Sequence, residues 1–578
     1  NTPIFLRIAT FANPTTITVF QPAGSYSTTF TVAPNSLYSL DLSASVAIIE
    51  NQPANTVLGY GLKVSSDNPI TAVYEIVSNT NLNPETYSLK GQNGLGTEFV
   101  TPFQTLWDNG TTFSPTPYTM FCIVASQNNT TVWITPRCNV VGHAANATYS
   151  VSLNQGETYT CQNASAFPSA PGFNLSGSIV ASDKPISITV SDDSAWERGN
   201  TLGMGGGCRD VMGDQIVPTD VIGTEYIVNK GQMFDGTNPG NNDSLYNAFE
   251  GIFVVATKNF TTITVNDGTV TTYTMNQGDT WYYNIKQPLT YVTSDKNVYV
   301  IQASGFGCEL GEAILPPINC SGSSQVSFTR TNNQSFLLNI LCKSGTEGAF
   351  TLNGSTTLVT AAMFNPVPGT GGTWMGAQIS FNTTDIPSGT ANLLTNSMDN
   401  FSLGVINGGT TTGCLFHYMS SFIRRVYTDA GPDALQCTNN ISVNLNGSVT
   451  GGTTSGVWTT PNGTGTFTSP GSLSTGYTLS GLDSTKTSLT FVLTSTGNCL
   501  PVSDTMTVLL AKSPVVSAGA DVTMCANNVT PAALNGYFNY CLGANWSGGN
   551  GGAFGNTGST STTYTPSPAD ISSGQVLI

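Results

Sequence analysis

The stretch Val180-Ala181-Ser182-Asp183-Lys184-Pro185-Ile186 decides the fold, because similar stretches occur before and after it. They are Val64-Ser65-Ser66-Asp67-Asn68-Pro69-Ile70 and Val292-Thr293-Ser294-Asp295-Lys296-Asn297-Val298. An Asp caps its own turn and a Pro fixes the next backbone angle, so the pattern predicts a strand, a turn and a second strand. Repetition at long, similar intervals indicates related modules rather than one enzyme core.

Each of these stretches belongs to a longer unit. Three of the units open on similar apolar segments, at Phe5–Thr10, Phe121–Ser126 and Phe253–Thr257. A short polar turn and a Thr-rich strand follow each segment, and a fourth, degenerate unit begins near Phe336. We therefore predict four β-rich units, at residues 1–110, 111–235, 236–330 and 331–426.

Strands are marked throughout by alternating apolar and polar residues, as in Thr15–Val19 and Thr261–Val265. We find no long amphipathic helix. The predicted fold class is all-β, with tandem antiparallel β-sandwich units. About seven or eight strands per unit suit one sandwich or two propeller blades, so a propeller-like arrangement stays open for the N-terminal region.

A second, shorter repeat follows. Leu445-Asn446-Gly447, Trp458 and Tyr477 recur as Leu534-Asn535-Gly536, Trp546 and Tyr564. We predict an immunoglobulin-like β-sandwich at 427–514, with Trp458 in its core, and the start of another at 515–578. The second copy is expected to be incomplete, since Ile578 falls near the position of Phe491, and we expect the natural chain to continue beyond it.

Composition limits the possible functions. Of 578 residues only 9% are charged, and the net charge is -16. Such a surface repels phosphate backbones, so nucleic acid is not an expected partner. Aromatic residues make up 10% of the chain, which favours a folded protein over a disordered one. No apolar run is long enough to span a membrane in this segment.

Twelve cysteines occur without the CxxC pairs of zinc ribbons, which favours disulfides in an oxidising compartment. Cys437 and Cys499 are placed to join the first and last strands of the first immunoglobulin-like repeat. In the first 426 residues the cysteines permit many pairings. We favour Cys138 with Cys161, Cys308 with Cys320 and Cys342 with Cys414, because they are near in sequence or bracket a unit.

The order of motifs in the first part of the chain carries a family resemblance. Ser191-Asp192-Asp193-Ser194, the run from Asp210 to Pro218, and Gly223-Thr224-Glu225-Tyr226 resemble the IgGFc-binding-type domain found at the N-terminus of large secreted proteins. The resemblance covers about residues 1 to 425. It implies a β-rich fold and a role at a surface, and it does not imply antibody binding.

The shorter repeat resembles another family. Ala518-Gly519-Ala520-Asp521, Leu534-Asn535-Gly536, Trp546 and Tyr564-Thr565-Pro566 resemble the immunoglobulin-like repeats of Bacteroidetes gliding-motility adhesins, which the type 9 secretion system exports. This resemblance implies the bacterial outer surface. It also implies O-glycosylation at Asp-Ser/Thr-apolar triplets, with Ser194, Ser244 and Thr505 as candidate acceptors.

The strongest candidate for a chemical site is a set of acids: Asp192, Asp193, Asp210 and Asp214. Close carboxylates can bind calcium, the one cofactor that the sequence proposes, and acids of this kind also cap turns and face water. The sequence offers few candidates for catalytic residues. His143 and His417 are the two histidines, and no Gly-x-Ser-x-Gly elbow is present. We expect no enzyme activity. Trp281-Tyr282-Tyr283 and Trp374 are candidates for stacking against sugars.

These observations favour a secreted cell-surface adhesin or filament tip: a binding head on a stalk of repeats, acting in gliding motility or surface attachment. Its expected partners are an extracellular polysaccharide or surface ligand, and proteins of the secretion or motility machinery. One alternative is a secreted calcium-dependent carbohydrate-binding protein or glycan hydrolase. Another is a structural cap that docks on an export or motility partner.

Overall fold

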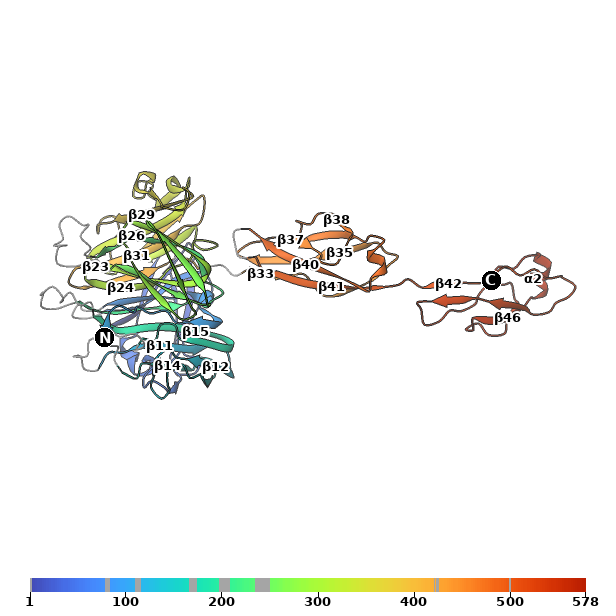
Figure 1. The fold of residues 1–578 in the computed structure, drawn as a ribbon, viewed down its shortest axis with the longest axis horizontal. Coiled ribbons are helices and arrows are strands. Elements are labelled where there is room, and N and C mark those ends of the chain that lie inside the picture. Colours follow the sequence, from blue (N-terminus) through green and yellow to red (C-terminus); the bar gives the residue numbers. More distant parts are fainter. Residues whose placement is uncertain are drawn as a thin grey trace. The chain divides into compact units, whose positions relative to one another are not determined.

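The computed structural model describes residues 3–77, 84–109, 116–165, 174–196, 208–233, 250–419, 421–422, 426–497 and 501–578. The chain divides into two compact units, a head of Asn1–Arg425 and a second unit of Val426–Ile578 (Figure 1). Strands are the main regular structure of both units and the helices are short, so the predicted all-β class is confirmed. The boundaries predicted inside the head stay predictions.

The described helices are short. They are η1 (Ser43–Ser45), α1 (Val46–Ile49), η2 (Gly91–Gly94), η5 (Glu347–Ala349), η6 (Ala361–Met363), η7 (Asp483–Thr485) and α2 (Pro568–Ser573).

The head begins with a β-sandwich. One sheet has the order β4-β1-β7-β8 and the other β3-β2-β6. The strands are β1 (Ile4–Thr10), β2 (Thr15–Phe20), β3 (Ser27–Val32), β4 (Leu37–Asp41), β6 (Lys63–Ser66), β7 (Ile70–Ile76) and β8 (Glu85–Ser88). Leu6, Ile8, Ile17 and Val19 are buried together, because alternation along β1 and β2 turns these side chains to one face.

The next two parts of the head share one topology. Their sheets have the orders β13-β12-β15-β11-β14 and β21-β20-β23-β19-β22, and β16 and β24 pair with the long strands β15 and β23. The strands of the first are β11 (Thr119–Ala125), β12 (Thr130–Thr135), β13 (Tyr149–Leu153), β14 (Thr158–Gln162), β15 (Ile179–Trp196) and β16 (Arg209–Ile216). Those of the second are β19 (Gly251–Ala256), β20 (Thr261–Asn266), β21 (Val270–Met275), β22 (Thr280–Asn284), β23 (Leu289–Gly307) and β24 (Glu309–Ile314).

Five short strands join these sheets. β5 (Val57–Leu58) pairs with β14, β9 (Gly96–Val100) and β10 (Asp108–Asn109) pair with β15, and β17 (Gly223–Asn229) and β18 (Gln232–Met233) pair with β23.

The repeated Asp makes the same contact three times. Asp67, Asp183 and Asp295 each accept a hydrogen bond through Oδ1 from the backbone N–H of a Thr, at 2.8, 2.7 and 2.7 Å. The donors are Thr16, Thr131 and Thr262, near the start of β2, β12 and β20. The predicted strand–turn–strand holds for the first copy, where β6 and β7 are separate. In the other two the chain continues as one strand, with a register shift at this point in its pairing with β9 or β17.

The last part of the head again has two sheets, β25-β30-β27 and β28-β29-β26-β31-β32. Their strands are β25 (Gln325–Thr329), β26 (Ser335–Lys343), β27 (Phe350–Leu352), β28 (Asn365–Pro366), β29 (Trp374–Ser380), β30 (Ala391–Asn396), β31 (Ser402–Gly409) and β32 (Gly413–Tyr418). Phe328, Phe336 and Phe350 are buried in its core.

Four strands meet at the centre of the head. β8, β16, β24 and β32, here called the central strands, each pair with the strand before them. They also contact one another in the order β8, β16, β24, β32 and back to β8. No backbone ladder joins one central strand to the next among the described residues.

The second unit contains two copies of one motif. The first has sheets β33-β36, β34-β41-β40-β37 and β35-β39-β38, and the second has β42-β44 and β43-β46-β45. The first is formed by β33 (Val426–Asp429), β34 (Ala434–Cys437), β35 (Ser442–Asn446), β36 (Ser448–Gly451), β37 (Ser455–Thr459), β38 (Thr466–Phe467), β39 (Ser474–Thr478), β40 (Ser488–Thr496) and β41 (Ser503–Ala511). The second is formed by β42 (Val515–Ser517), β43 (Ala532–Asn535), β44 (Tyr537–Asn539), β45 (Ala553–Phe554) and β46 (Ser561–Thr565).

The tryptophans of the two copies make the same contact. Trp458 donates from Nε1 to the carbonyl of Leu473 at 3.2 Å, and Trp546 donates to the carbonyl of Ser559 at 2.8 Å. A Cβ on Gly447 or Gly536 would lie 2.9 Å from the indole of Trp458 or Trp546, respectively. The Gly of each Leu-Asn-Gly therefore leaves room for the tryptophan.

A tyrosine and an aspartate form the second shared contact. Tyr477 donates its hydroxyl to Asp483 at 3.0 Å, and Tyr564 donates to Asp570 at 2.8 Å. Trp458 and Tyr477 are buried, as predicted for the core of an immunoglobulin-like repeat.

Close contact between central strands generates a stability prediction. A Cβ added at Gly311 on β24 would lie 2.8 Å from the Cβ of Phe416 on β32 and 2.9 Å from the backbone N of the same residue. We expect Gly311→Ala to lower the free energy of unfolding of the head by about 1 to 3 kcal/mol, because backbone cannot move aside as a side chain can. Thermal or denaturant unfolding of the full chain measures this.

The matched control is Gly348→Ala, where nothing lies within 4 Å of the added Cβ. Equal stability of the two variants would contradict the close packing of β24 on β32.

Candidate functional site

Carboxylates join the central strands in place of a ladder. Asp210 Oδ2 accepts a hydrogen bond from the backbone N of Leu310 on β24 at 2.9 Å. Asp214 Oδ2 accepts from Ile314 N on β24 at 3.2 Å, and its Oδ1 accepts from Ser88 N on β8 at 3.1 Å. The three N–H groups point away from the strands' own hairpin partners, and Asp side chains satisfy them.

The local sequence explains this arrangement. Gly213-Asp214-Gln215-Ile216-Val217-Pro218 on β16 matches Gly311-Glu312-Ala313-Ile314-Leu315-Pro316 on β24. The motif places an acid beside a Gly, so that an adjacent strand can come close to the backbone. A Cβ on Gly213 would lie 2.7 Å from the ring of Tyr87, next to β8 residue Ser88.

Burial controls the charge of these acids. Desolvation raises the pKa of Glu85 and of Glu312 well above the usual range, and the charges of neighbouring acids raise both further. Burial also raises the pKa of Asp192 to about 7, although hydrogen bonds from Gln104 and Asn109 oppose the shift. A head with few charges thus holds several acids that favour the neutral form.

The four calcium candidates lie on β15 and β16, and each has protein donors. Asp192 accepts from Gln104 Nε2 at 2.8 Å and Asn109 Nδ2 at 2.6 Å. Asp193 accepts from Tyr118 N at 3.3 Å. Within the described residues, no three of these acids bring oxygens within 4.8 Å of one another. The structure does not gather them into one ligand set, and calcium binding stays a prediction.

A pocket lies where the last part of the head meets the first. Its volume is about 360 Å³, and segments at residues 69–72, 88–93, 323–326 and 418–422 line it, together with Phe11. Hydroxyl and amide side chains are frequent in this lining, among them Asn93, Ser324 and Gln325, and no Asp, Glu, His or Cys lines it. Lys90 is the one charged residue of the described lining, which thus offers polar contacts and no carboxyl group.

Aromatic pairs lie elsewhere and join β3 to β4, β13 to β14 and β21 to β22. Phe30 stacks on Tyr38, Tyr149 meets Tyr159 edge-on, and Tyr273 stacks on Trp281, with ring centroids 4.1, 6.2 and 5.3 Å apart.

Of the predicted stacking residues, Trp281 and Tyr283 are partly buried against one core. Tyr282 packs against another, and Trp374 packs against a third. Tyr273 exposes 49% of its surface and is the accessible member of its pair.

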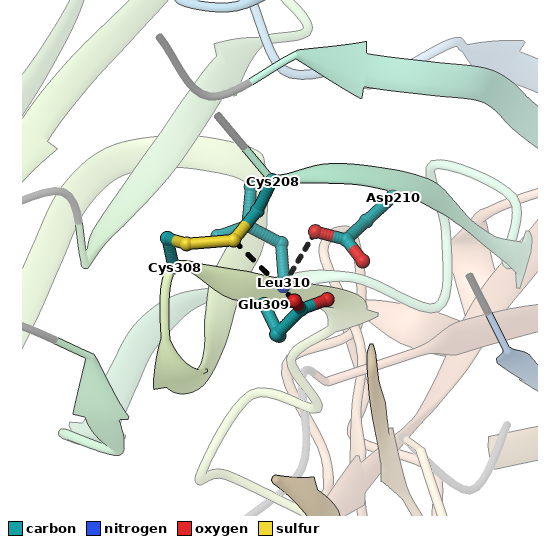
Figure 2. The surroundings of a disulfide bond; sticks show 5 residues. All are labelled: Cys208, Asp210, Cys308, Glu309 and Leu310. Carbon is teal, nitrogen blue, oxygen red and sulfur yellow. Dashed lines mark hydrogen bonds between the residues drawn. A yellow bond between two sulfur atoms is a disulfide. The ribbon is translucent and has the colours of Figure 1, made fainter. Parts of the chain in front are cut away.

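One disulfide links Cys208, before β16, to Cys308, before β24 (Figure 2). The predicted pairing of Cys308 with Cys320 is therefore wrong. Beside the bond, Asp210 accepts from Leu310 N and Glu309 Oε1 lies 3.4 Å from Cys208 Sγ (Figure 2). The disulfide and Asp210 together hold the starts of two central strands.

The pairing of Cys342 with Cys414 is also wrong, because both are free thiols. Cys342 and Cys414 belong to different buried clusters. Cys414 on β32 pairs with Gly408 on β31, and Gly408 pairs with Ser335 on β26. Ser335 lies seven residues before Cys342 on the same strand. That offset exceeds the reach of a disulfide.

The predicted pairing of Cys138 with Cys161 is wrong as well, because both are free thiols. The Cys138 thiol donates to Asn163 Oδ1 at 2.7 Å, and the Cys161 sulfur accepts from the Tyr149 hydroxyl at 3.5 Å. Cys437 is an exposed free thiol, level with Ala511 at the end of β41, whereas Cys499 precedes the start of that strand and lies outside the described residues.

The glycosylation candidates differ in exposure. Ser194 is only 4% exposed, so the folded head does not offer it to a glycosyltransferase. Thr505 is exposed on β41 and stays a prediction, and Ser244 lies outside the described residues.

Sequence reasoning missed Glu85, Lys90 and the lining of the pocket. It also missed Glu312, although the match of Glu312 to Asp214 within the Gly-acid-x-Ile motif is a usable signal. No sequence signal links residues 88–93 with 418–422, because folding alone brings them together.

Comparison with known proteins agrees with the first resemblance. A family model described as IgGFc binding protein matches residues 84–406. The chain belongs to this family. The match begins one residue before β8 and ends in β31, so three of the four central strands lie inside it.

Other comparisons add little. No curated protein matches. Among solved structures, Escherichia coli alpha-2-macroglobulin aligns over 96% of this chain and 41% of its own, at 9% identity and a TM-score of 0.12. Sidekick-1 immunoglobulin domains 1-5 align over 86% and 93%, at 9% identity and a TM-score of 0.13. The chain thus spans less than half of that macroglobulin, and similarities this low carry no argument. No helix in the described part of the chain is long and apolar enough to cross a bilayer.

The buried acids generate a pH prediction. Asp192 has a pKa of about 7 in the head, against about 3.9 in an unfolded chain. Between these values the folded state keeps a proton that the unfolded state has lost. The free energy of unfolding of the head should therefore fall as pH rises from about 4 to 7.

Asp192→Asn should reduce this slope, as measured by unfolding at a series of pH values. Asp279→Asn, at a 40% exposed side chain, is the control and should keep the slope. An unchanged slope in Asp192→Asn would contradict the assignment.

Proposed function

We propose that this protein is a secreted, non-enzymatic adhesin of the bacterial outer surface, whose head binds an extracellular ligand. Membership of the IgGFc-binding family supports a binding role. The Cys208–Cys308 disulfide supports an oxidising, extracytoplasmic environment. The expected roles in gliding motility and type 9 secretion, and the partners among that machinery, belong to this proposal and rest on the resemblance of the repeats.

The pocket is the observation that carries the proposal. Its lining combines Phe11, a half-buried aromatic side chain, with the polar groups of Asn93, Ser324 and Gln325. A few polar groups around apolar walls are typical of small-ligand sites. Hydroxyls and amides match the hydroxyls of a neutral sugar, and an aromatic face packs against a pyranose ring. We therefore propose a segment of extracellular polysaccharide as the ligand.

The chemistry of the lining favours binding over catalysis. Glycoside hydrolysis needs two carboxyl groups beside the scissile bond. The described lining has no carboxyl group, and Asp210 and Asp214 on β16 are buried and hydrogen-bonded to neighbouring strands. The second unit fits a stalk, since its two copies repeat the same Trp and Tyr–Asp contacts and each stabilises itself locally.

Attachment of beads carrying the full chain to a polysaccharide-coated surface tests the proposal. Deleting residues 1–425 should abolish attachment. Ser324→Trp should reduce it at least tenfold, because the indole fills the exposed rim of the pocket. Ser27→Trp is the matched control, since Ser27 is exposed at the end of β3 that pairs with Phe20.

Attachment that survives Ser324→Trp in a folded protein would exclude the pocket, and Tyr273→Ala would then test the aromatic edge. Attachment that is lost on adding a chelator would favour the calcium-dependent alternative.

A further inference from the structure

Lys90 and Asp214 form an unusual ion pair in the head. Lys90 Nζ lies 2.7 Å from Asp214 Oδ2, and the side chains expose only 3% and 0% of their surface. Lys90 follows β8 and Asp214 lies on β16, so the pair connects strands that share no ladder. The ring of Phe422 covers the ammonium group, with its centroid 5.2 Å from Nζ.

In the other lysine–aspartate pairs of the described residues the lysine is at least 30% exposed, and only the Lys486–Asp483 pair has a buried aspartate. Lys343 and Asp399 are 43% and 33% exposed at 2.9 Å, and Lys296 and Asp295 are 34% and 49% exposed at 2.8 Å. Burying two charges costs several kcal/mol for each ion before their attraction is counted. Loss of both charges therefore relieves a desolvation cost in the Lys90–Asp214 pair that the exposed pairs do not bear.

Burial favours the neutral forms of both groups. It lowers the pKa of Lys90 and raises the pKa of Asp214, although the attraction between the two charges opposes each shift. A neutral amine beside a neutral carboxylic acid is the reactant pair for amide formation.

Hydrogen bonds also hold the Asp214 carboxyl group in place for attack by the amine. Its Oδ1 accepts from Ser88 N at 3.1 Å, Ser88 Oγ at 3.3 Å and Gln215 N at 2.8 Å. Donors aimed at one oxygen stabilise the negative charge that develops there in a tetrahedral intermediate. The other oxygen, Oδ2, accepts from Ile314 N at 3.2 Å and faces the amine, and it is the oxygen that leaves.

A buried acid lies close in the fold. Glu312 stands two residues before Ile314, whose backbone N donates to Asp214 Oδ2 at 3.2 Å, and its side chain is buried. A carboxyl group there is a candidate proton carrier, and the Glu312→Gln variant tests that role.

We propose that Lys90 and Asp214 condense into an intramolecular amide bond. The lone pair of Nζ attacks Cγ of Asp214, the C–N bond forms, and the bond from Cγ to Oδ2 breaks. The oxygen leaves as water with two protons, one from the acid and one from the amine, so the ion pair becomes one amide and one water without any oxidant or cofactor. The product joins β16 covalently to the segment that follows β8.

Mass spectrometry of the reduced, denatured full chain tests this proposal. The wild type should be lighter than its sequence by one water. A tryptic digest should show no cleavage after Lys90 and a branched peptide that joins Lys90 to Asp214. Lys90→Arg keeps the charge and the hydrogen bonds but should restore the full mass. Glu312→Gln should slow formation of the bond.

The exposed Lys343–Asp399 pair is an internal control and should stay uncoupled in the same digest. A wild type of full mass overturns the proposal. So does a deficit of one water that persists in Lys90→Arg without a branched peptide, because that result indicates a succinimide at an Asp instead.

Discussion

The head depends on how four central strands meet without pairing to one another. Each of β8, β16, β24 and β32 uses one edge for its own hairpin. At the other edge, buried N–H groups need acceptors, and an unsatisfied one costs about 1 to 3 kcal/mol. Asp214 supplies acceptors to Ser88 and Ile314 at once, so a single side chain holds β8, β16 and β24 together.

This constraint accounts for the distribution of charge. The chain has few charged residues, yet Glu85, Asp192, Asp210, Asp214 and Glu312 are all buried. Acceptors for outward N–H groups must come from side chains where no ladder forms, and carboxyl groups provide two oxygens each. Of the four acids that the sequence offers as calcium ligands, Asp210 and Asp214 belong to this framework, whereas Asp192 and Asp193 accept hydrogen bonds from other parts of the head.

Local and periodic features could be predicted from the sequence. The repeated Asp marks the same contact to a Thr N–H in three places, and the spacing of Trp458 and Tyr477 marks an immunoglobulin-like core. The recurrence of these residues is visible in the sequence, whereas the Asp contacts themselves are not, because they join residues 33 to 52 positions apart. The disulfide was not predictable, since Cys208 and Cys308 come together only when β16 and β24 pack. The pocket and the Lys90–Asp214 pair depend on the same packing.

The central claim is that carboxylates replace a ladder between the central strands. Amide hydrogen exchange of the full chain, resolved to single residues, tests it most directly. The account predicts that the N–H groups of Ser88, Leu310 and Ile314 exchange as slowly as ladder N–H groups within β15 and β23. Exchange as fast as that of the exposed strand β21 would contradict it.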